Sequence, residues 1–325
     1  MDTGSHLLFG ATLAGLSLVD PTVSAHPDLL YAVLAATLIG SHAPDFDAVM
    51  RLKGGSAYIR NHRGLTHSLP APLVWAPLIG LPIAWFFGVQ EWSWTVILWA
   101  FIAVCFHITL DLFNAYGVQC MRPFTRRWLH LDVLCLLDPY LFAMHAAVVL
   151  LWTTGATPNP VRMFLLVYAL TLIYMLWRFL VSRSVIRSLC RAYRVNLGQI
   201  TLTPTLFGMA WQFVIDTGDA FIKGNLNRSV VHEEAMLYKR SPERLAAAAE
   251  ATIDVDGVQA FHHLAACIHV DVEEHADGYL VIWSDVRFWH KKHTPFTAAV
   301  RLDRNFNVIH ERVGWNKKMW EPPFV

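Results

Sequence analysis

Charged residues are scarce in this chain, and neither sign is in excess. Of its 325 residues only 16% are charged and 55% are hydrophobic, and the formal net charge is +1. A chain without a strong basic field is not expected to bind nucleic acid. So apolar a composition is untypical of an ordinary soluble enzyme and predicts an integral membrane protein.

Cysteine is scarce too, and several common catalytic signatures are missing. The five cysteines are scattered, odd in number and without a CxxC pair, so we expect reduced thiols and no disulfide framework. The sequence has no HExxH, no GxSxG and no glycine-rich phosphate loop, which argues against the enzyme classes that carry those motifs. The stretch MDTGSHLLFG has no Lys or Arg, so we expect it to begin the first helix and not a cleavable signal.

Long apolar stretches dominate the first part of the chain. Four of them reach the ~20 residues that a helix needs to cross a bilayer. They cover residues 69–88, 94–114, 133–153 and 161–181, and two shorter apolar helices are expected at 5–19 and 29–41. We therefore predict that residues 1–181 form an α-helical membrane bundle of four long spans and two short N-terminal helices, followed by a basic juxtamembrane linker over 182–197.

Positive charge lies in alternate connections between these stretches. Lys and Arg occur in residues 51–63, 122–127 and 183–194, whereas residues 88–93 and 154–160 contain neither. Because basic loops stay in the cytoplasm, this alternation predicts a multi-pass topology whose C-terminal domain is cytoplasmic.

From about residue 198 the pattern changes to short runs of alternating apolar and polar residues, separated by Gly and Asn, which predict β-hairpins. A helix is expected to begin at Ser241-Pro242, ahead of a run of alanines. The expected strands cover residues 199–203, 205–215, 220–226, 229–238, 267–274, 279–289, 296–303 and 307–313. We predict a β-rich, antiparallel α+β soluble domain over residues 198–325.

Ionisable side chains stand at the ends of the apolar stretches, where they are costly unless a partner compensates their charge. In SHAPDFD, Pro44 is expected to make the chain extended, so that Asp45 and Asp47 point the same way and offer two carboxylates to one ion. Turn and capping chemistry is the alternative interpretation of both residues.

Two histidines, His62 and His67, flank a glycine turn in HRGLTHS. Two imidazoles close in sequence to carboxylates favour a metal site, although a lone interfacial histidine is more often structural. Arg63, between them, either neutralises a substrate phosphate or is simply a charge of a cytoplasmic loop.

His107 and Asp111 are the strongest local signal, because positions i and i+4 share one helix face inside an apolar stretch. A hydrogen-bonded pair that joins two helices is the alternative. Asp138, before Pro139, is either a ligand or a helix cap. His6, His42 and His130 are within range as supporting groups. The predicted topology brings the seven main candidates to one membrane face.

Three motifs occur in order among the apolar stretches: SHAPDFD, HRGLTHS and HxxxDxxNxYG, the last with His107, Asp111, Asn114, Tyr116 and Gly117. Together they resemble the YdjM-like family of bacterial membrane-bound metal-dependent hydrolases, over about residues 1–180. The resemblance implies an inner-membrane hydrolase related in motif style to zinc-dependent phospholipases, without naming a substrate.

The leading hypothesis is a hydrolase with one or two divalent ions, Zn²⁺ before Mn²⁺. The expected metal ligands are Asp45, Asp47, His62, His67, His107, Asp111 and Asp138. Asp45 or Asp111, if uncoordinated, would act as base, and Arg63 would offset phosphate charge. A site at the inner headgroups favours a phosphoester of a lipid or lipid-linked substrate. Two alternatives remain, a metal transporter or sensor with the same ligands, and a purely structural helix clasp with an adaptor domain.

Overall fold

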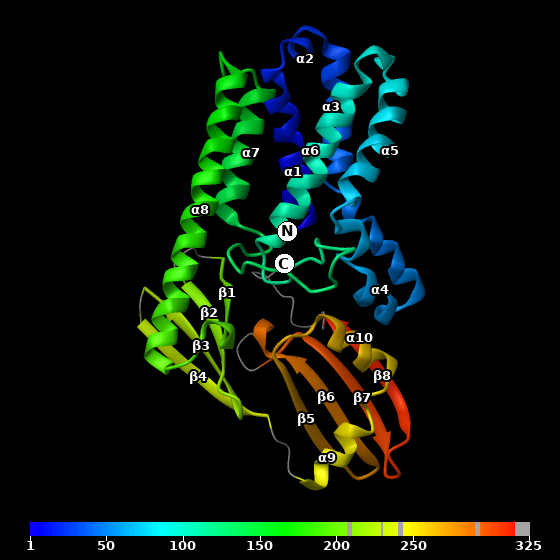
Figure 1. The fold of residues 1–325 in the computed structure, drawn as a ribbon, viewed down its shortest axis with the longest axis vertical. Coiled ribbons are helices and arrows are strands. Elements are labelled where there is room, and N and C mark those ends of the chain that lie inside the picture. Colours follow the sequence, from blue (N-terminus) through cyan, green and yellow to red (C-terminus); the bar gives the residue numbers. More distant parts are fainter. Residues whose placement is uncertain (207–209, 229, 240–242, 290–292, 316–325) are drawn as a thin grey trace. The chain divides into compact units, whose positions relative to one another are not determined.

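The computed structural model describes residues 1–206, 210–228, 230–239, 243–289 and 293–315. The chain divides into two compact units (Figure 1). The first unit comprises Met1–Asp47 and Arg63–Val181, and the second comprises Ala48–His62 and Ser182–Val325. The first unit is helical, and the second contains the β-strands.

The helices of the first unit begin at residues that suit a helix start. Proline is the first residue of α2, α3, α7 and α8, where its missing N–H costs no hydrogen bond. The helices are α1 (Thr3–Leu16), α2 (Pro21–Ala25), α3 (Pro27–Gly40), α5 (Ala71–Phe86), α6 (Ser93–Leu112), α7 (Pro139–Thr153) and the first part of α8 (Pro160–Tyr193). Helix α6 packs on α3 and α5, and α1 packs on α3 and α7.

The four long spans expected from the sequence are not confirmed. Among the described residues, Gln90–Leu112 and Pro160–Tyr193 are long and apolar enough to cross a membrane, and the count rises to four only if two bent helix pairs each form one span. The stretch expected at 133–153 is helical only from Pro139, because the preceding Asp138 caps the helix there. The two short N-terminal helices are present as α1 and α3.

Small residues bring the helices of the first unit together. A Cβ at Gly80 of α5 would meet the Cα of Ile97 on α6 at 2.8 Å, so only glycine permits this approach. Buried Ala32, Ala36, Ala100 and Ala103 fill the contact between α3 and α6. This packing fixes the C-terminal end of α6, which carries His107 and Asp111.

The second unit confirms the predicted antiparallel β-rich architecture. Its described strands form two four-stranded antiparallel sheets, ordered β1-β2-β3-β4 and β5-β6-β7-β8. The strands are β1 (Ile200–Pro204), β2 (Ala210–Asp216), β3 (Ala220–Asn227), β4 (Val230–Tyr238), β5 (Ile268–His275), β6 (Gly278–Asp285), β7 (Phe296–Asp303) and β8 (Val308–Trp315). In β7, alternate residues from Phe296 to Leu302 are buried, as expected for a half-covered sheet. Helices α9 (Glu243–Glu250) and α10 (Asp256–Leu264) connect the sheets, whereas the predicted starts at Ser229 and Ser241-Pro242 lie outside the described residues.

A segment from the N-terminal part of the chain is built into the second unit. Helix α4 (Gly55–Asn61) packs on α10 and β8, and Arg60 forms an ion pair of 2.7 Å with Asp256 at the start of α10. From the sequence these residues were expected to form only a basic loop of the membrane domain. Helix α8 also runs on past Val181 to Tyr193, so most of the linker expected at 182–197 is helical.

Candidate metal centre

The first motif does not take the extended form that Pro44 was expected to impose. Residues Ala43–Lys53 form a run of 3₁₀ helix, η2, in whose first turn Pro44 lies. Proline is tolerated in the first turn of a helix, and this position outweighs the extended preference that proline imposes on its predecessor. Asp45 and Asp47 both turn inward, but each side chain meets different partners.

Four side chains of the first unit converge on one point. The Nε2 atoms of His67 and His107 are 3.2 Å apart. The Oδ1 atom of Asp45 lies 3.5 Å from the first imidazole and 3.7 Å from the second. The Oδ2 atom of Asp111 lies 3.5 Å and 3.6 Å from the same two nitrogens. With all four atoms within 4.8 Å of one another, the group could hold one metal ion.

Two of these four atoms accept no hydrogen bond from the described part of the chain. Asp45 Oδ1 and Asp111 Oδ2 are buried and accept no hydrogen bond among the described residues. A buried acceptor left unsatisfied costs about 1–3 kcal/mol, and more when it is charged. A cation bound between them would remove this cost, so the oxygens fit a metal ligand set.

Each imidazole is oriented by an oxygen atom that lies against its Nδ1, the ring nitrogen outside the four-atom group. His107 Nδ1 donates to the carbonyl oxygen of Ser41 at 2.7 Å, which leaves the lone pair on the Nε2 that faces the group. His67 Nδ1 lies 3.0 Å from Thr66 Oγ1, and Thr66 in turn donates to Asp47 Oδ2 at 2.7 Å. Metal-ligating histidines are typically held in this way, by an oxygen on the far nitrogen. Asp47 therefore stands behind His67 and outside the four-atom group.

Arg63 connects the second motif to the third. It is buried, with a left-handed backbone at φ 58°. Its backbone N–H donates to Asp47 Oδ2 at 2.9 Å, and its guanidinium donates to Asp111 Oδ1 at 3.0 Å and to Asn114 Oδ1 at 3.2 Å. The guanidinium thus compensates one oxygen of Asp111 and leaves the other directed toward the imidazoles.

The N-terminal segment also reaches this group. The ring of His6 stacks on that of His107 at 3.8 Å between centroids, and its Nε2 lies 3.5 Å from Asp111 Oδ1. The amino group of Met1 contacts the same oxygen. The sequence alone leaves the role of His6 open and indicates none for Thr66. No local sequence pattern indicates a role for either residue, because only the fold brings each of them to the metal centre.

Two predicted ligands, Asp138 and His62, lie outside the four-atom group. Asp138 caps α7 by accepting from the backbone N–H groups of Tyr140 and Leu141, both at 3.2 Å, and it also accepts from the hydroxyl of Tyr174 at 2.9 Å. His62 belongs to the second unit, where it ends α4 and stacks on Tyr58 at 4.7 Å. The capping role of Asp138 accounts for its carboxylate, whereas His62 as a metal ligand stays a prediction.

Comparison with known proteins assigns both parts of the chain. Residues 1–185 match the family described as YdjM inner membrane protein, and residues 247–321 match the YfhP C-terminal alpha/beta plait domain. The uncharacterized protein YfhP of Bacillus subtilis (strain 168) is 34% identical over 317 residues, which cover 97% of this chain and 95% of the relative. No solved structure matches the chain.

Proposed function

This chain belongs to the YdjM inner membrane protein family, and we propose that it is a membrane-bound metal-dependent hydrolase acting on a phosphoester of a lipid. The observation that carries the proposal is the convergence of two imidazole nitrogens with two buried carboxylate oxygens that accept no hydrogen bond among the described residues. Two imidazoles with two carboxylates form a ligand set typical of divalent transition metals in hydrolases.

The spacing of the four atoms supports zinc. A tetrahedral ion with ligand distances of ~2.0–2.1 Å has ligand atoms ~3.3 Å apart. The distances from each imidazole nitrogen to the other and to the two carboxylate oxygens run from 3.2 to 3.7 Å, a range that includes that value. Calcium would need six to eight oxygen ligands at longer distances. We therefore assign one Zn²⁺ to this group, with Mn²⁺ as the second choice.

Each residue has a defined part in the proposed reaction. A bound divalent cation supplies Lewis acidity and lowers the pKa of water toward neutrality. His67 and His107 present fixed lone pairs, and Arg63 positions Asp111. Asp45 is the ligand with an open side, since its side chain is 19% exposed and those of the other three are fully covered. The role of base, expected from the sequence for an uncoordinated Asp45 or Asp111, stays a prediction.

A second role of Arg63, contact with the substrate phosphate, stays a prediction. Its guanidinium is hydrogen-bonded to Asp111 and Asn114, and this arrangement supports a positioning role. The role expected from the sequence, offsetting the charge of a substrate phosphate at the cytoplasmic face, requires the same group to reach the substrate. The positive-inside pattern of the loops supports that side of the membrane.

The test is a hydrolysis screen with the full chain in detergent or vesicles, using phospholipids and lipid phosphates. We expect turnover that chelation removes and Zn²⁺ restores, and we expect His107→Ala to abolish it. His26→Ala is the matched control, because this exposed histidine packs on Trp92 at the opposite end of α6. The proposal fails if His107→Ala retains both its bound metal and its turnover.

A metal transporter is the second candidate, favoured by one observation. A buried polar chain lies among α1, α7 and α8, in which His145 bonds to Thr12 at 2.9 Å and to Thr171 at 2.8 Å. Transport needs polar groups at several depths of a membrane. Both nitrogens of His145 are engaged within the bundle, which favours a clasp between helices. Metal flux into proteoliposomes without lipid hydrolysis would reverse this ranking.

A further inference from the structure

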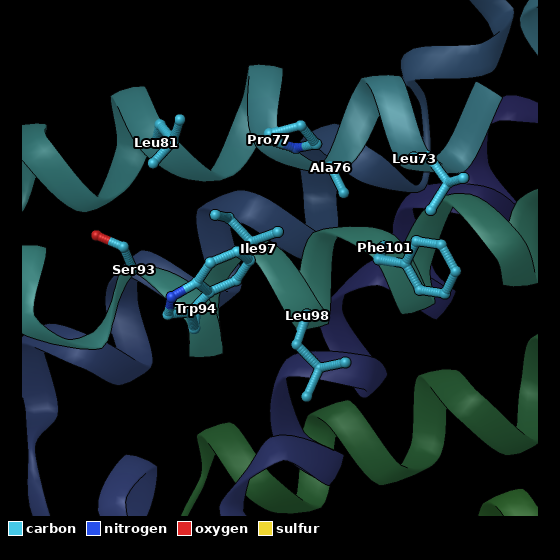
Figure 2. A pocket seen from close by; sticks show the side chains of 9 residues that line it. All are labelled: Leu73, Ala76, Pro77, Leu81, Ser93, Trp94, Ile97, Leu98 and Phe101. Atoms are coloured by element: carbon cyan, nitrogen blue, oxygen red, sulfur yellow. The ribbon is translucent and has the colours of Figure 1, made fainter. Parts of the chain in front are cut away.

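An apolar groove leads away from the candidate metal centre. One pocket, of about 340 Å³, is lined by His67 together with Leu69, Leu73, Cys105 and Ile108. A second, of about 600 Å³, lies between α5 and α6 and is lined almost entirely by apolar side chains (Figure 2). Leu73 and Phe101 line both pockets, so the two meet at these side chains. We call the combined space the α5–α6 groove.

The groove runs along the two helices from the metal centre toward their other end. Figure 2 shows Leu73 and Phe101 at one end of the second pocket and Leu81 and Trp94 at the other. On α6, the distance from Trp94 to Ile108 is 14 residues, or ~21 Å at 1.5 Å per residue. The groove is therefore long, and His67 is among the residues that line one end of it.

The walls of the groove lie on the outer surface of the bundle. The exposed fractions are 68% for Leu73, 53% for Leu98 and 81% for Trp94. Exposed leucines on membrane helices face hydrocarbon, so whatever enters the groove comes from the bilayer and is itself apolar. One acyl layer is ~15 Å thick, half of the ~30 Å hydrocarbon core, so a single acyl chain fits within the length of the groove.

We propose that the α5–α6 groove binds one acyl chain of a glycerophospholipid and thereby brings its phosphate to the metal centre. The inference rests on the proposed function and adds the substrate class and the groove that selects it. A polyprenyl chain is far longer than one leaflet and would extend well beyond the groove, so we assign the acyl lipid. His67 connects the two, because its imidazole belongs to the four-atom group and the residue is among those that line the first pocket.

The first arm of the test does not depend on catalysis. The full chain is placed in phosphatidylglycerol vesicles containing a small share of phosphatidylglycerol with a diazirine at the tail end of a palmitoyl chain. Photolysis followed by peptide mass spectrometry locates the labelled residues. We expect labelling concentrated on the groove walls, and we expect Leu73→Trp to reduce it about tenfold, the lower end of the discrimination that an apolar pocket gives per methylene.

The chain offers a matched control on the same helix. Leu78 is 62% exposed and lines neither pocket, so Leu78→Trp adds the same bulk beside the groove and leaves labelling unchanged. Leu98→Trp fills the groove from α6 and repeats the test if Leu73→Trp fails to fold. Labelling spread evenly over the lipid-facing leucines, or equal loss in Leu73→Trp and Leu78→Trp, would overturn the groove. Displacement by polyprenyl phosphate in preference to phosphatidylglycerol would overturn the acyl assignment.

The second arm measures hydrolysis against chain length. We expect Leu73→Trp to lower the ratio of long-chain to short-chain turnover about tenfold while its metal content stays at the wild-type value. If the wild type hydrolyses no lipid but labels in the groove, the proposed function fails and the groove stands. If it hydrolyses lipids with no change of chain preference in the variant, the groove fails and the proposed function stands.

Discussion

Each unit of the molecule buries an aspartate completely, and the two aspartates differ in what surrounds them. Asp285 of the second unit receives Arg287 Nη2 at 2.7 Å, Arg287 Nε at 2.9 Å and the backbone N–H of Ala266 at 3.1 Å. Asp111 of the first unit has one oxygen bonded to Arg63, while its Oδ2 faces two imidazoles and accepts no hydrogen bond among the described residues.

The difference is the one expected between a carboxylate that serves only the fold and one that binds a cation. A buried carboxylate that serves only the fold is compensated by groups of the chain itself, because an uncompensated charge is costly. Asp285 meets that condition with both oxygens. The compensation of Asp111 is incomplete, and the remaining oxygen lies where a cation would complete it. The predictions below test this distinction, beginning with the largest expected effect.

Removing the structural aspartate should have the largest effect on stability. Asp285→Ala leaves Arg287 buried without its carboxylate, and we expect the free energy of unfolding of the second unit to fall by about 3–5 kcal/mol. Thermal or denaturant unfolding of the full chain in detergent measures this. Asp277→Ala, which breaks an exposed pair with Arg301, is the control and should change little. Equal effects of the two substitutions would contradict the assigned role of Asp285.

The equivalent change in the first unit should act more on metal binding than on the fold. Asp111→Asn keeps an oxygen for Arg63 but removes the carboxylate from the four-atom group. We expect metal affinity to fall more than the roughly 10–100-fold that outer groups typically contribute. The metal-free protein should be destabilised less than by Asp285→Ala, because the Asn oxygen still accepts from Arg63. Titration against a zinc chelator measures the affinity. A variant that loses stability and keeps its metal would place Asp111 in the same class as Asp285.

A smaller effect on metal affinity is expected from the residues that support the imidazole of His67. Asp47→Asn weakens the support of His67 through Thr66, so metal affinity should fall by roughly 10–100-fold without being abolished. Thr66→Val interrupts the same connection and should give a loss of similar size. If Asp47→Asn loses metal as completely as Asp111→Asn, then Asp47 is itself a ligand, as the sequence first indicated.

The smallest effect is expected at an exposed pair of the second unit. The hydrogen bond from Arg60 lowers the pKa of Asp256, whose side chain is 60% exposed. The contribution of such a group is present above the unfolded carboxyl pKa and is lost as the pH falls through the folded pKa. Arg60→Ala should therefore cost less than about 0.5 kcal/mol at neutral pH, and less still near pH 3. A larger loss that persists at low pH would mean that Arg60 supports the packing of α4 in some other way.

The fold could be predicted best where it follows from a local pattern of apolar and polar residues. The alternation in residues such as Phe296 to Leu302 indicated strands, and the structure has them in two antiparallel sheets. Hydropathy overestimated the length of the span expected at 133–153, because it does not register that Asp138-Pro139 starts a helix inside that apolar stretch. The place of α4 in the second unit depends on contacts with α10, nearly two hundred residues later, which no local pattern reveals.

The candidate site was predictable in part for the same reason. His107 and Asp111 share a helix face by spacing alone, and the structure keeps them together. Asp45 and Asp47 were expected to act alike in an extended chain, but the 3₁₀ helix gives them different partners. The stacking of His6 on His107 joins segments a hundred residues apart, so it could be found only from the fold.

The most direct measurement is the metal content and metal–ligand distance of the full chain purified without chelator. Elemental analysis combined with X-ray absorption should find about one zinc per chain, bound by nitrogen and oxygen atoms at ~2.0–2.1 Å. Protein that is folded, yet carries no stoichiometric divalent metal and takes up none when zinc is supplied, would contradict the account.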